Sequence, residues 1–335
     1  MAHINIPVFV PHYGCPHQCV FCNQKTITGQ KSPLSVDDAE KIINEHLTTV
    51  NNHDDFVEIA FFGGSFTAID KEKQTELCTL AKKYIDMGKV NTFRCSTRPD
   101  CINEDILDNL KKYGIGTIEL GVQSTDDEVL TLSERGHTRD DVFKASKLIK
   151  EYGISLGLQM MTNLPGDTFE KSIKTCEDLI SLSPSCVRIY PTLTLEQTKL
   201  YDMYNEGKYV PFSLEETVDL LSILIDKFTK AGIDIIRVGL QTTDNINEDT
   251  VIGPYHQAIR ELAESRIFRT RLENHISSEK NVSYDVYVNP RYVSKATGQK
   301  RCNIEYFKDK YGADIRIKPS NETEGSSFIV KARQK

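Results

Sequence analysis

The feature that most constrains the fold of this 335-residue chain is a regular alternation of two kinds of segment over its first two thirds. Short apolar runs rich in β-branched and aromatic residues predict strands buried on both faces, at 6–10, 57–62, 92–96, 117–122, 155–160, 186–190 and 233–238. Longer amphipathic stretches between them predict helices, at 36–50, 71–86, 104–113, 139–152, 169–182 and 214–231. Because repeated strand–helix units build parallel sheets with right-handed crossovers, we expect an α/β fold, a partial (β/α)6 TIM-like barrel.

The last part of the chain has a different pattern. A polar, loop-like break at 244–254 and a helix-like stretch at 257–271 lead to strand-like segments at 285–288, 313–318 and 326–331, with two helix-like segments at 291–296 and 303–311. We therefore predict a barrel at 1–243, a helical bridge at 244–280 and a small α+β domain at 281–335.

Composition narrows the setting in which the chain works. No apolar run approaches the roughly 20 residues that cross a bilayer, and the N-terminus has no basic region followed by an apolar stretch, as a secretion signal has. We therefore expect a cytoplasmic protein without a membrane partner. The nine cysteines, an odd number, favour metal binding or buried thiols over a disulfide framework.

Three of the cysteines lie close together after the first predicted strand, in the run Cys15-Pro-His-Gln-Cys19-Val-Phe-Cys22. Thiolate is the soft ligand that iron–sulfur centres need, and three ligands leave one iron of a cubane open to a substrate. A structural zinc site is the alternative, with His12 or His17 as the fourth ligand.

The C-x3-C-x2-C spacing, with the aromatic Phe21 before the last cysteine, resembles the signature of the radical S-adenosylmethionine (SAM) superfamily. The resemblance implies a [4Fe-4S] cluster on Cys15, Cys19 and Cys22 whose open iron binds SAM. An electron from a donor such as flavodoxin or ferredoxin then cleaves SAM to a 5′-deoxyadenosyl radical, which abstracts a hydrogen atom from the substrate.

Further polar motifs lie where predicted strands end, and the carboxyl ends of parallel strands meet at one edge of a barrel. The same resemblance implies that this edge binds SAM, through Phe21, Gly63, Gly64, Ser65, Ser96, Arg98, Gln123, Arg135 and Gln159. The interval from Gln123 to Arg135 is similar to that in oxygen-independent coproporphyrinogen oxidases, and Gln159 stands where those enzymes carry an acidic ribose ligand. Tyr190 is the candidate catalytic residue on the substrate side.

Three of these assignments have a simpler structural alternative. The Gly63-Gly64 pair is also what a turn requires, Arg98 is also suited to a surface ion pair, and Tyr190 is also suited to packing in the barrel wall.

Segments 61–67, 96–100, 118–124, 188–192 and 253–256 resemble the radical domain of the Elongator catalytic subunit family. Members of that family modify the wobble uridine of tRNA and carry an acetyltransferase domain. Here the chain ends too soon for such a domain, so we expect a different donor or no acetyl-dependent step.

The β-α-α-β order of the tail, with Thr297-Gly-Gln-Lys-Arg301 between the helices, resembles a KH domain, whose G-x-x-G loop clamps single-stranded RNA. Residues 285–335 hold 11 Lys and Arg against 6 Asp and Glu, although the whole chain has a net charge of −7. Candidate RNA contacts are Lys295, Gly298, Lys300, Arg301 and Lys308. A capping domain with solvated lysines is the alternative.

The leading hypothesis is thus a radical SAM enzyme that modifies RNA, with tRNA as the partner. A second hypothesis is a radical enzyme acting on a small molecule, similar to the coproporphyrinogen oxidases, with the tail as a structural cap. A third is a non-enzymatic iron–sulfur protein that binds RNA or senses redox state.

Overall fold

The computed structural model describes residues 2–10, 15–23, 34–50, 52, 54–241, 246–276 and 282–333. The chain divides into two compact units, one of residues 1–211 and 228–255 and the other of residues 212–227 and 256–335. The predicted division at residues 243 and 280 stays a prediction.

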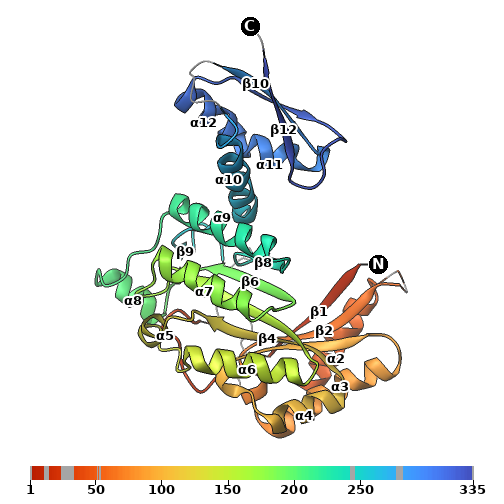
Figure 1. Cartoon of the computed structure of the whole chain (residues 1–335). Helices are drawn as coiled ribbons and strands as arrows, with labels where there is room; N and C mark the ends of the chain where they lie inside the picture. Colours follow the sequence, from red (N-terminus) through yellow and green to blue (C-terminus); the bar gives the residue numbers. More distant parts are fainter. Residues whose placement is uncertain are drawn as a thin grey trace. The chain divides into compact units, whose positions relative to one another are not determined.

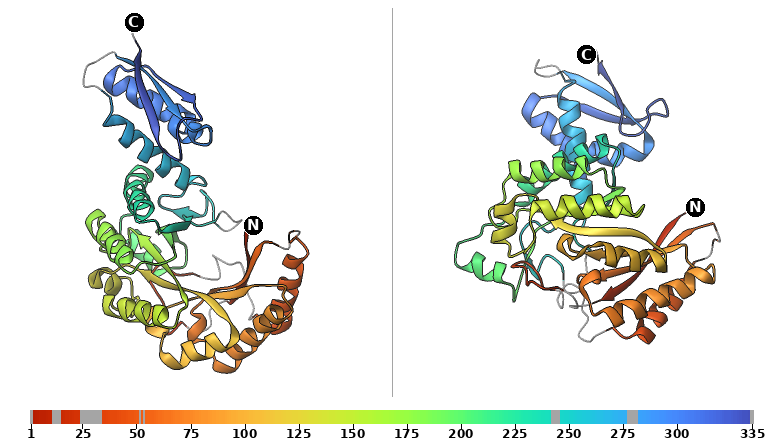
Figure 2. Two further views of the ribbon diagram at one scale, coloured as in Figure 1. Left: turned by 45° about the vertical axis from the view of Figure 1, so that its right-hand side comes forward. Right: turned by 60° about the horizontal axis from the view of Figure 1, so that its bottom comes forward.

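Seven parallel strands form the sheet of the first unit, in the order β1-β2-β3-β4-β5-β6-β8. They are His3–Val10, Phe56–Gly63, Thr92–Thr97, Ile115–Gln123, Ser155–Thr162, Cys186–Pro191 and Asp234–Val238. The sheet curls into an open half-barrel with helices along its convex side (Figure 1, Figure 2). All seven predicted strands and the predicted fold class are confirmed.

The helices that connect these strands begin at side-chain caps. They are α2 (Val36–Leu47), α3 (Lys71–Asp86), α4 (Glu104–Tyr113), α6 (Arg139–Glu151) and α7 (Phe169–Ser181), followed by α9 (Leu214–Lys230). Thr138 shows the mechanism, since it forms a reciprocal capping box with Asp141 at the start of α6. The capping residues explain why these helices begin at the residues that the pattern predicts.

Several short helices and strands of the first unit were not predicted from the sequence. They are α5 (Asp127–Leu132), α8 (Lys199–Asn205), the 3-10 turns η1 (Phe66–Ala68) and η2 (Pro99–Cys101), and strands β7 (Thr194–Leu195) and β9 (Val251–Ile252). The last two pair antiparallel with each other. The prediction of a loop throughout 244–254 was therefore wrong at its β-branched Val251-Ile252 pair, because β7 offers these residues a partner strand.

The second unit contains α10 (Ile259–Glu273) and a three-stranded sheet in the order β11-β10-β12. Its later elements are β10 (Ser283–Val288), η3 (Pro290–Tyr292), α11 (Val293–Thr297), η4 (Gln299–Arg301), α12 (Cys302–Tyr311), β11 (Ile315–Pro319) and β12 (Phe328–Arg333). Strand β10 runs parallel to β11 and antiparallel to β12. The predicted β-α-α-β order is confirmed, and the helices and strands enclose an apolar core around Val286 and Phe307.

Within the described residues, no helix is long and apolar enough to span a membrane.

Candidate functional site

The cysteine segment is held in place by backbone bonds to two neighbouring elements. The amide of Val20 donates to the carbonyl of Ser133 over 3.1 Å, and the amide of Leu200 in α8 donates to the carbonyl of Val20 over 2.9 Å. A tight turn, from the amide of Cys22 to the carbonyl of Cys19 at 3.1 Å, brings these two cysteines near each other. The segment is therefore ordered by contacts with α8 and with the connection between α5 and α6.

Phe21 has a packing role in this segment. It lies against a small apolar cluster of Val20, Leu200 and Tyr209. The Tyr209 hydroxyl in turn donates to the carbonyl of Asn163 over 2.8 Å, at the end of β5. The aromatic residue before Cys22 thus ties the cysteine segment to the rim of the half-barrel.

The three thiols differ in exposure, with Cys15 exposed, Cys19 buried and Cys22 half-buried. Within the described residues, no group of three Cys, His, Asp or Glu side chains is arranged as a metal site. His12 lies outside the described residues. The iron-ligand role of the cysteines therefore stays a prediction, and so does its zinc alternative.

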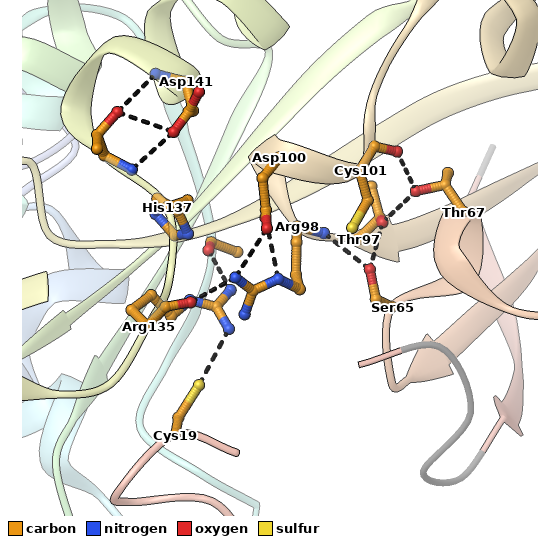
Figure 3. Close-up of polar contacts among 12 residues, drawn as sticks. Cys19, Ser65, Thr67, Thr97, Arg98, Asp100, Cys101, Arg135, His137 and Asp141 are labelled. Atoms are coloured by element: carbon orange, nitrogen blue, oxygen red, sulfur yellow. Dashed lines mark hydrogen bonds and ion pairs between the residues drawn. The ribbon is translucent and has the colours of Figure 1, made fainter. Parts of the chain in front are cut away.

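Two arginines converge beside the cysteine segment (Figure 3). Arg135 directs Nη1 at the sulfur of Cys19, 3.4 Å away, and Nη2 at the carbonyl of Gly121. Arg98, whose side chain is 2% exposed, donates to the carbonyl of Arg135 and forms a forked ion pair with Asp100 at 2.9 and 3.0 Å. Arg98 therefore forms an ion pair, as its structural alternative predicted. This ion pair lies in the interior beside the cysteines, not on the surface.

The glycine motif after β2 has a steric cause. Gly63 has a φ of +116°, and a Cβ there would lie 2.7 Å from the carbonyl oxygen of Val10. Only glycine fits where β1 and β2 end side by side. Next to it, Ser65 is buried, and its hydroxyl lies 2.8 Å from that of Thr97 and accepts from the amide of Arg98. The Ser65 hydroxyl therefore organises the ends of β2 and β3.

The predicted glutamines are brought together with Arg135. The amide nitrogen of Gln159 lies 3.4 Å from Oε1 of Gln123. A Cβ on Gly121 would lie 2.8 Å from Nη2 of Arg135 and 3.2 Å from Nε2 of Gln123. These side chains meet where β4 ends, and their assignment to SAM stays a prediction. Ser96 lies at the register position opposite Glu119 on the neighbouring strand.

A ladder of buried charges crosses the strands below these residues. Ion pairs join Glu58 to Arg94 at 3.4 Å, Arg94 to Glu119 at 3.0 Å and Arg188 to Glu119 at 2.5 Å. Arg188 also contacts Tyr190, and burial raises the pKa of that phenol. Sequence reasoning did not identify this ladder, although a lone charge within each apolar strand was its signal.

His137 is a second residue that motif reading missed. Its Nε2 lies 3.1 Å from the carbonyl oxygen of Val122, and the imidazole is 3% exposed. Burial and the positive charges of Arg135 and Arg98 lower its pKa to about 3. A neutral imidazole is therefore part of the surroundings of the two arginines (Figure 3).

In the second unit, the loop between α11 and α12 has the conformation that a turn of this length needs. Gly298, Lys300 and Arg301 all have positive φ, of 78°, 50° and 65°. Lys300 and Arg301 are exposed, and no carboxylate pairs with either among the described residues. Lys308 is exposed as well, whereas Lys295 forms an ion pair with Glu264 at 2.6 Å.

The donors present in the first unit fit a cluster and an anionic cofactor group. Three thiols lie on one short segment, and thiolates suit iron. Arg98 Nη1 and Arg135 Nε are buried without a hydrogen-bond partner among the described residues. Buried guanidinium donors of this kind normally meet an acceptor, and a carboxylate suits them.

Comparison with known families agrees with this chemistry. Residues 9–179, just over half of the chain, match the model of the radical SAM superfamily. Residues 184–269 match the radical SAM C-terminal domain.

Individual relatives cover different shares of the chain. A tRNA uridine(34) acetyltransferase of Methanocaldococcus jannaschii is 32% identical over 198 residues, which are 53% of this chain and 37% of that protein. The heme chaperone HemW of Bacillus subtilis is 22% identical over 94% of this chain and 87% of its own length. The solved Elp3 of Methanocaldococcus infernus, lacking its N-terminus, shares the fold with a TM-score of 0.63 at 23% identity, over 81% of this chain and 64% of that one. The half-barrel, the cysteine segment and the family match together show that this chain belongs to the radical SAM superfamily.

Proposed function

We propose that this radical SAM enzyme modifies RNA, with tRNA as its substrate. The observation that carries the RNA assignment is the Gly298–Arg301 loop between two helices of a β-α-α-β unit. Gly298 itself is buried, whereas Lys300 and Arg301 are exposed and form no ion pair with any described residue. Loops of this kind hold a single-stranded phosphate backbone. The relatives named tRNA uridine(34) acetyltransferases support the choice of tRNA.

The first unit would hold the cofactors through its own side chains. Cys15, Cys19 and Cys22 would ligate a [4Fe-4S] cluster, with Arg135 donating to the Cys19 sulfur. Gly63 and Gly64 would contact SAM through their backbone, Gln123 and Arg135 would bind SAM, and Gln159 would reach its ribose. When bound and reduced, the cluster and SAM supply a 5′-deoxyadenosyl radical. The reductant is an external electron donor such as flavodoxin or ferredoxin.

Tyr190 is the proposed residue on the substrate side. It follows Arg188 by two positions on β6, so the two side chains share one face of the sheet. The contact with Arg188, itself fixed by Glu119, would hold the phenol in one orientation.

Nucleoside profiling tests the proposal directly. Deletion of the gene should remove one modified nucleoside from tRNA, and the wild-type gene should restore it whereas a Cys19→Ala version should not. The purified, reconstituted enzyme should form 5′-deoxyadenosine anaerobically. An unchanged tRNA profile would contradict the RNA assignment while leaving the radical chemistry intact.

The similarity to HemW favours a second candidate, a radical enzyme on a porphyrin-like small molecule, because that alignment spans 94% of this chain. The two candidates differ in the role of the tail. Replacing Lys300 and Arg301 with Ala should weaken tRNA binding about ten- to hundred-fold if the tail holds RNA. The matched control is the pair Lys144→Ala and Lys147→Ala, two exposed cations on α6.

A further inference from the structure

The three-stranded sheet of the second unit has two chemically different faces. Tyr284, Val286 and Val288 of β10 point into the apolar core. Side chains alternate along a strand, so the intervening residues occupy the opposite face. We call this the outer sheet face and define it as Asp285, Tyr287, Arg316, Lys318, Ile329, Lys331 and Arg333.

Strand register places an aromatic ring at the centre of this face. Tyr287 lies opposite Lys318 on β11 and opposite Ile329 on β12. The ammonium groups of Lys318 and Lys331 lie 5.7 and 5.2 Å from the centroid of the Tyr287 ring. Ile329, at 37% exposure, is among the large apolar side chains that the chain leaves in solvent.

The charge of the face is positive after its ion pairs are counted. Four cations face two carboxylates, because Asp285 pairs with Lys318 and Arg333, and Asp314 pairs with Arg316 and Arg333. Lys331 is exposed and pairs with no carboxylate within the described residues. Helices α11 and α12 contribute Ala296 and Phe307 to the core on the other side of the sheet. The outer sheet face is therefore a surface separate from the Gly298–Arg301 loop.

We propose that the outer sheet face is a second contact site for single-stranded RNA, with a base stacked on Tyr287 and backbone phosphates held by Lys331 and Arg316. An aromatic ring among cations on an open sheet is the combination that binds unpaired nucleotides, since every base can stack and every phosphate is anionic. An acidic protein would satisfy the cations but would leave the ring and Ile329 without a planar partner. This site rests on the proposed RNA substrate and adds a second surface to it.

The test uses the full chain and a fluorescent single-stranded RNA, with affinity read by anisotropy at several salt concentrations. Tyr287→Leu should weaken binding about five-fold or more, because the base loses its stacking partner. Tyr287→Phe keeps the ring and should bind nearly as the wild type does. Lys331→Ala should lower the slope of log affinity against log salt by about one.

Matched controls separate this site from general effects. Tyr204→Leu removes an exposed aromatic from α8, and Lys147→Ala removes an exposed cation from α6. Neither should change RNA affinity. Circular dichroism melting of each variant verifies that the second unit stays folded.

The outcomes distinguish this inference from the proposed function. If the wild type and the Lys300→Ala, Arg301→Ala variant differ in RNA affinity but Tyr287→Leu binds as the wild type does, the outer sheet face is not a contact site. If the wild type binds no RNA at all, the proposed function fails first. Binding of an acidic polypeptide in place of RNA, lost equally in Tyr287→Leu and Tyr287→Phe, would overturn the RNA assignment of this face.

Discussion

The imidazole of His17 lies directly against the α-carbon of Gly136. A Cβ at residue 136 would stand 2.4 Å from Cδ2 of the ring, and Gly136 has a φ of +79°. His17 lies between Cys15 and Cys19. Because Gly136 has no side chain, the His17 ring can pack against the loop that follows α5, and this contact helps to position the cysteine segment.

We expect Gly136→Ala to loosen iron binding about ten-fold, the low end of what removing a supporting contact costs a metal site. The added methyl group would push His17 and the flanking cysteines away. Iron and sulfide content after anaerobic reconstitution, followed against a chelator, measures the effect.

Gly153→Ala is the matched control for the backbone conformation. Gly153 has a φ of +71°, and nothing lies within 4 Å of a Cβ there. Both variants carry the same left-handed strain, so only the contact with His17 separates them. Equal iron retention in the two variants would show that the contact does not matter.

A second prediction concerns the fork of Arg135, which reaches Cys19 and Gly121 with separate nitrogens. Lysine keeps the charge but has one nitrogen, so Arg135→Lys loses the fork. We expect 5′-deoxyadenosine formation to fall about ten- to hundred-fold and the electron paramagnetic resonance spectrum of the reduced cluster to change, because hydrogen bonds to sulfur tune iron–sulfur centres. Arg139 is 44% exposed and forms an ion pair with Asp178. The control variant Arg139→Lys should change neither 5′-deoxyadenosine formation nor the spectrum. An unaltered spectrum in Arg135→Lys would mean that the Nη1 contact is absent in the loaded protein.

The sheet could be predicted because its strands are local and strongly patterned. Runs such as Val57–Phe62 are apolar at nearly every position, which suits a strand covered on both sides. The β7 and β9 strands could not be predicted. Each has only two residues, and they form strands because the fold brings these distant segments together. Local pattern contains no information on such pairing.

The candidate site was predictable where a motif fixes it and not where contacts do. The family resemblance assigned Gln123 and Arg135 to one cofactor, and the fold brings both side chains beside Gly121. The contact between His17 and Gly136, the role of His137 and the packing of Phe21 depend on how separate loops meet. The motif assigned Ser65 to the cofactor, which stays a prediction, and it did not show that the Ser65 hydroxyl also joins β2 to β3.

The buried charge ladder leads to a stability prediction. Glu119→Gln would leave Arg94 and Arg188 facing a neutral amide in the interior, with Glu58 as the remaining carboxylate. Breaking a buried ion network by removing one partner costs about 3–5 kcal/mol of unfolding free energy. Urea unfolding of the wild type and of Glu119→Gln, followed by circular dichroism, measures this loss of unfolding free energy.

Glu76→Gln provides the comparison on the surface. Its ion pair with Lys73 is 3.3 Å long, and the glutamate side chain is 56% exposed. Pairs of this kind contribute about 1 kcal/mol at most. If Glu119→Gln and Glu76→Gln lose unfolding free energies that agree within about 1 kcal/mol, then water reaches the buried charge ladder and screens it.

The last prediction is a pH dependence that arises at His137. Burial, together with the charges of Arg135 and Arg98, lowers the pKa of this imidazole to about 3, whereas histidine in an unfolded chain titrates near about 6.5. Between these values the unfolded chain binds a proton that the folded chain does not. The contribution of His137 to stability is therefore complete above about pH 6.5 and is lost as the pH falls, by up to about 1.4 kcal/mol per pH unit.

His137→Gln removes this titration while keeping a donor for the carbonyl of Val122. Between about pH 7.5 and 5.5, the unfolding free energy of the wild type should fall more steeply than that of the variant. Parallel slopes in wild type and His137→Gln would contradict the prediction, because they would show that the pKa of this imidazole does not change on folding.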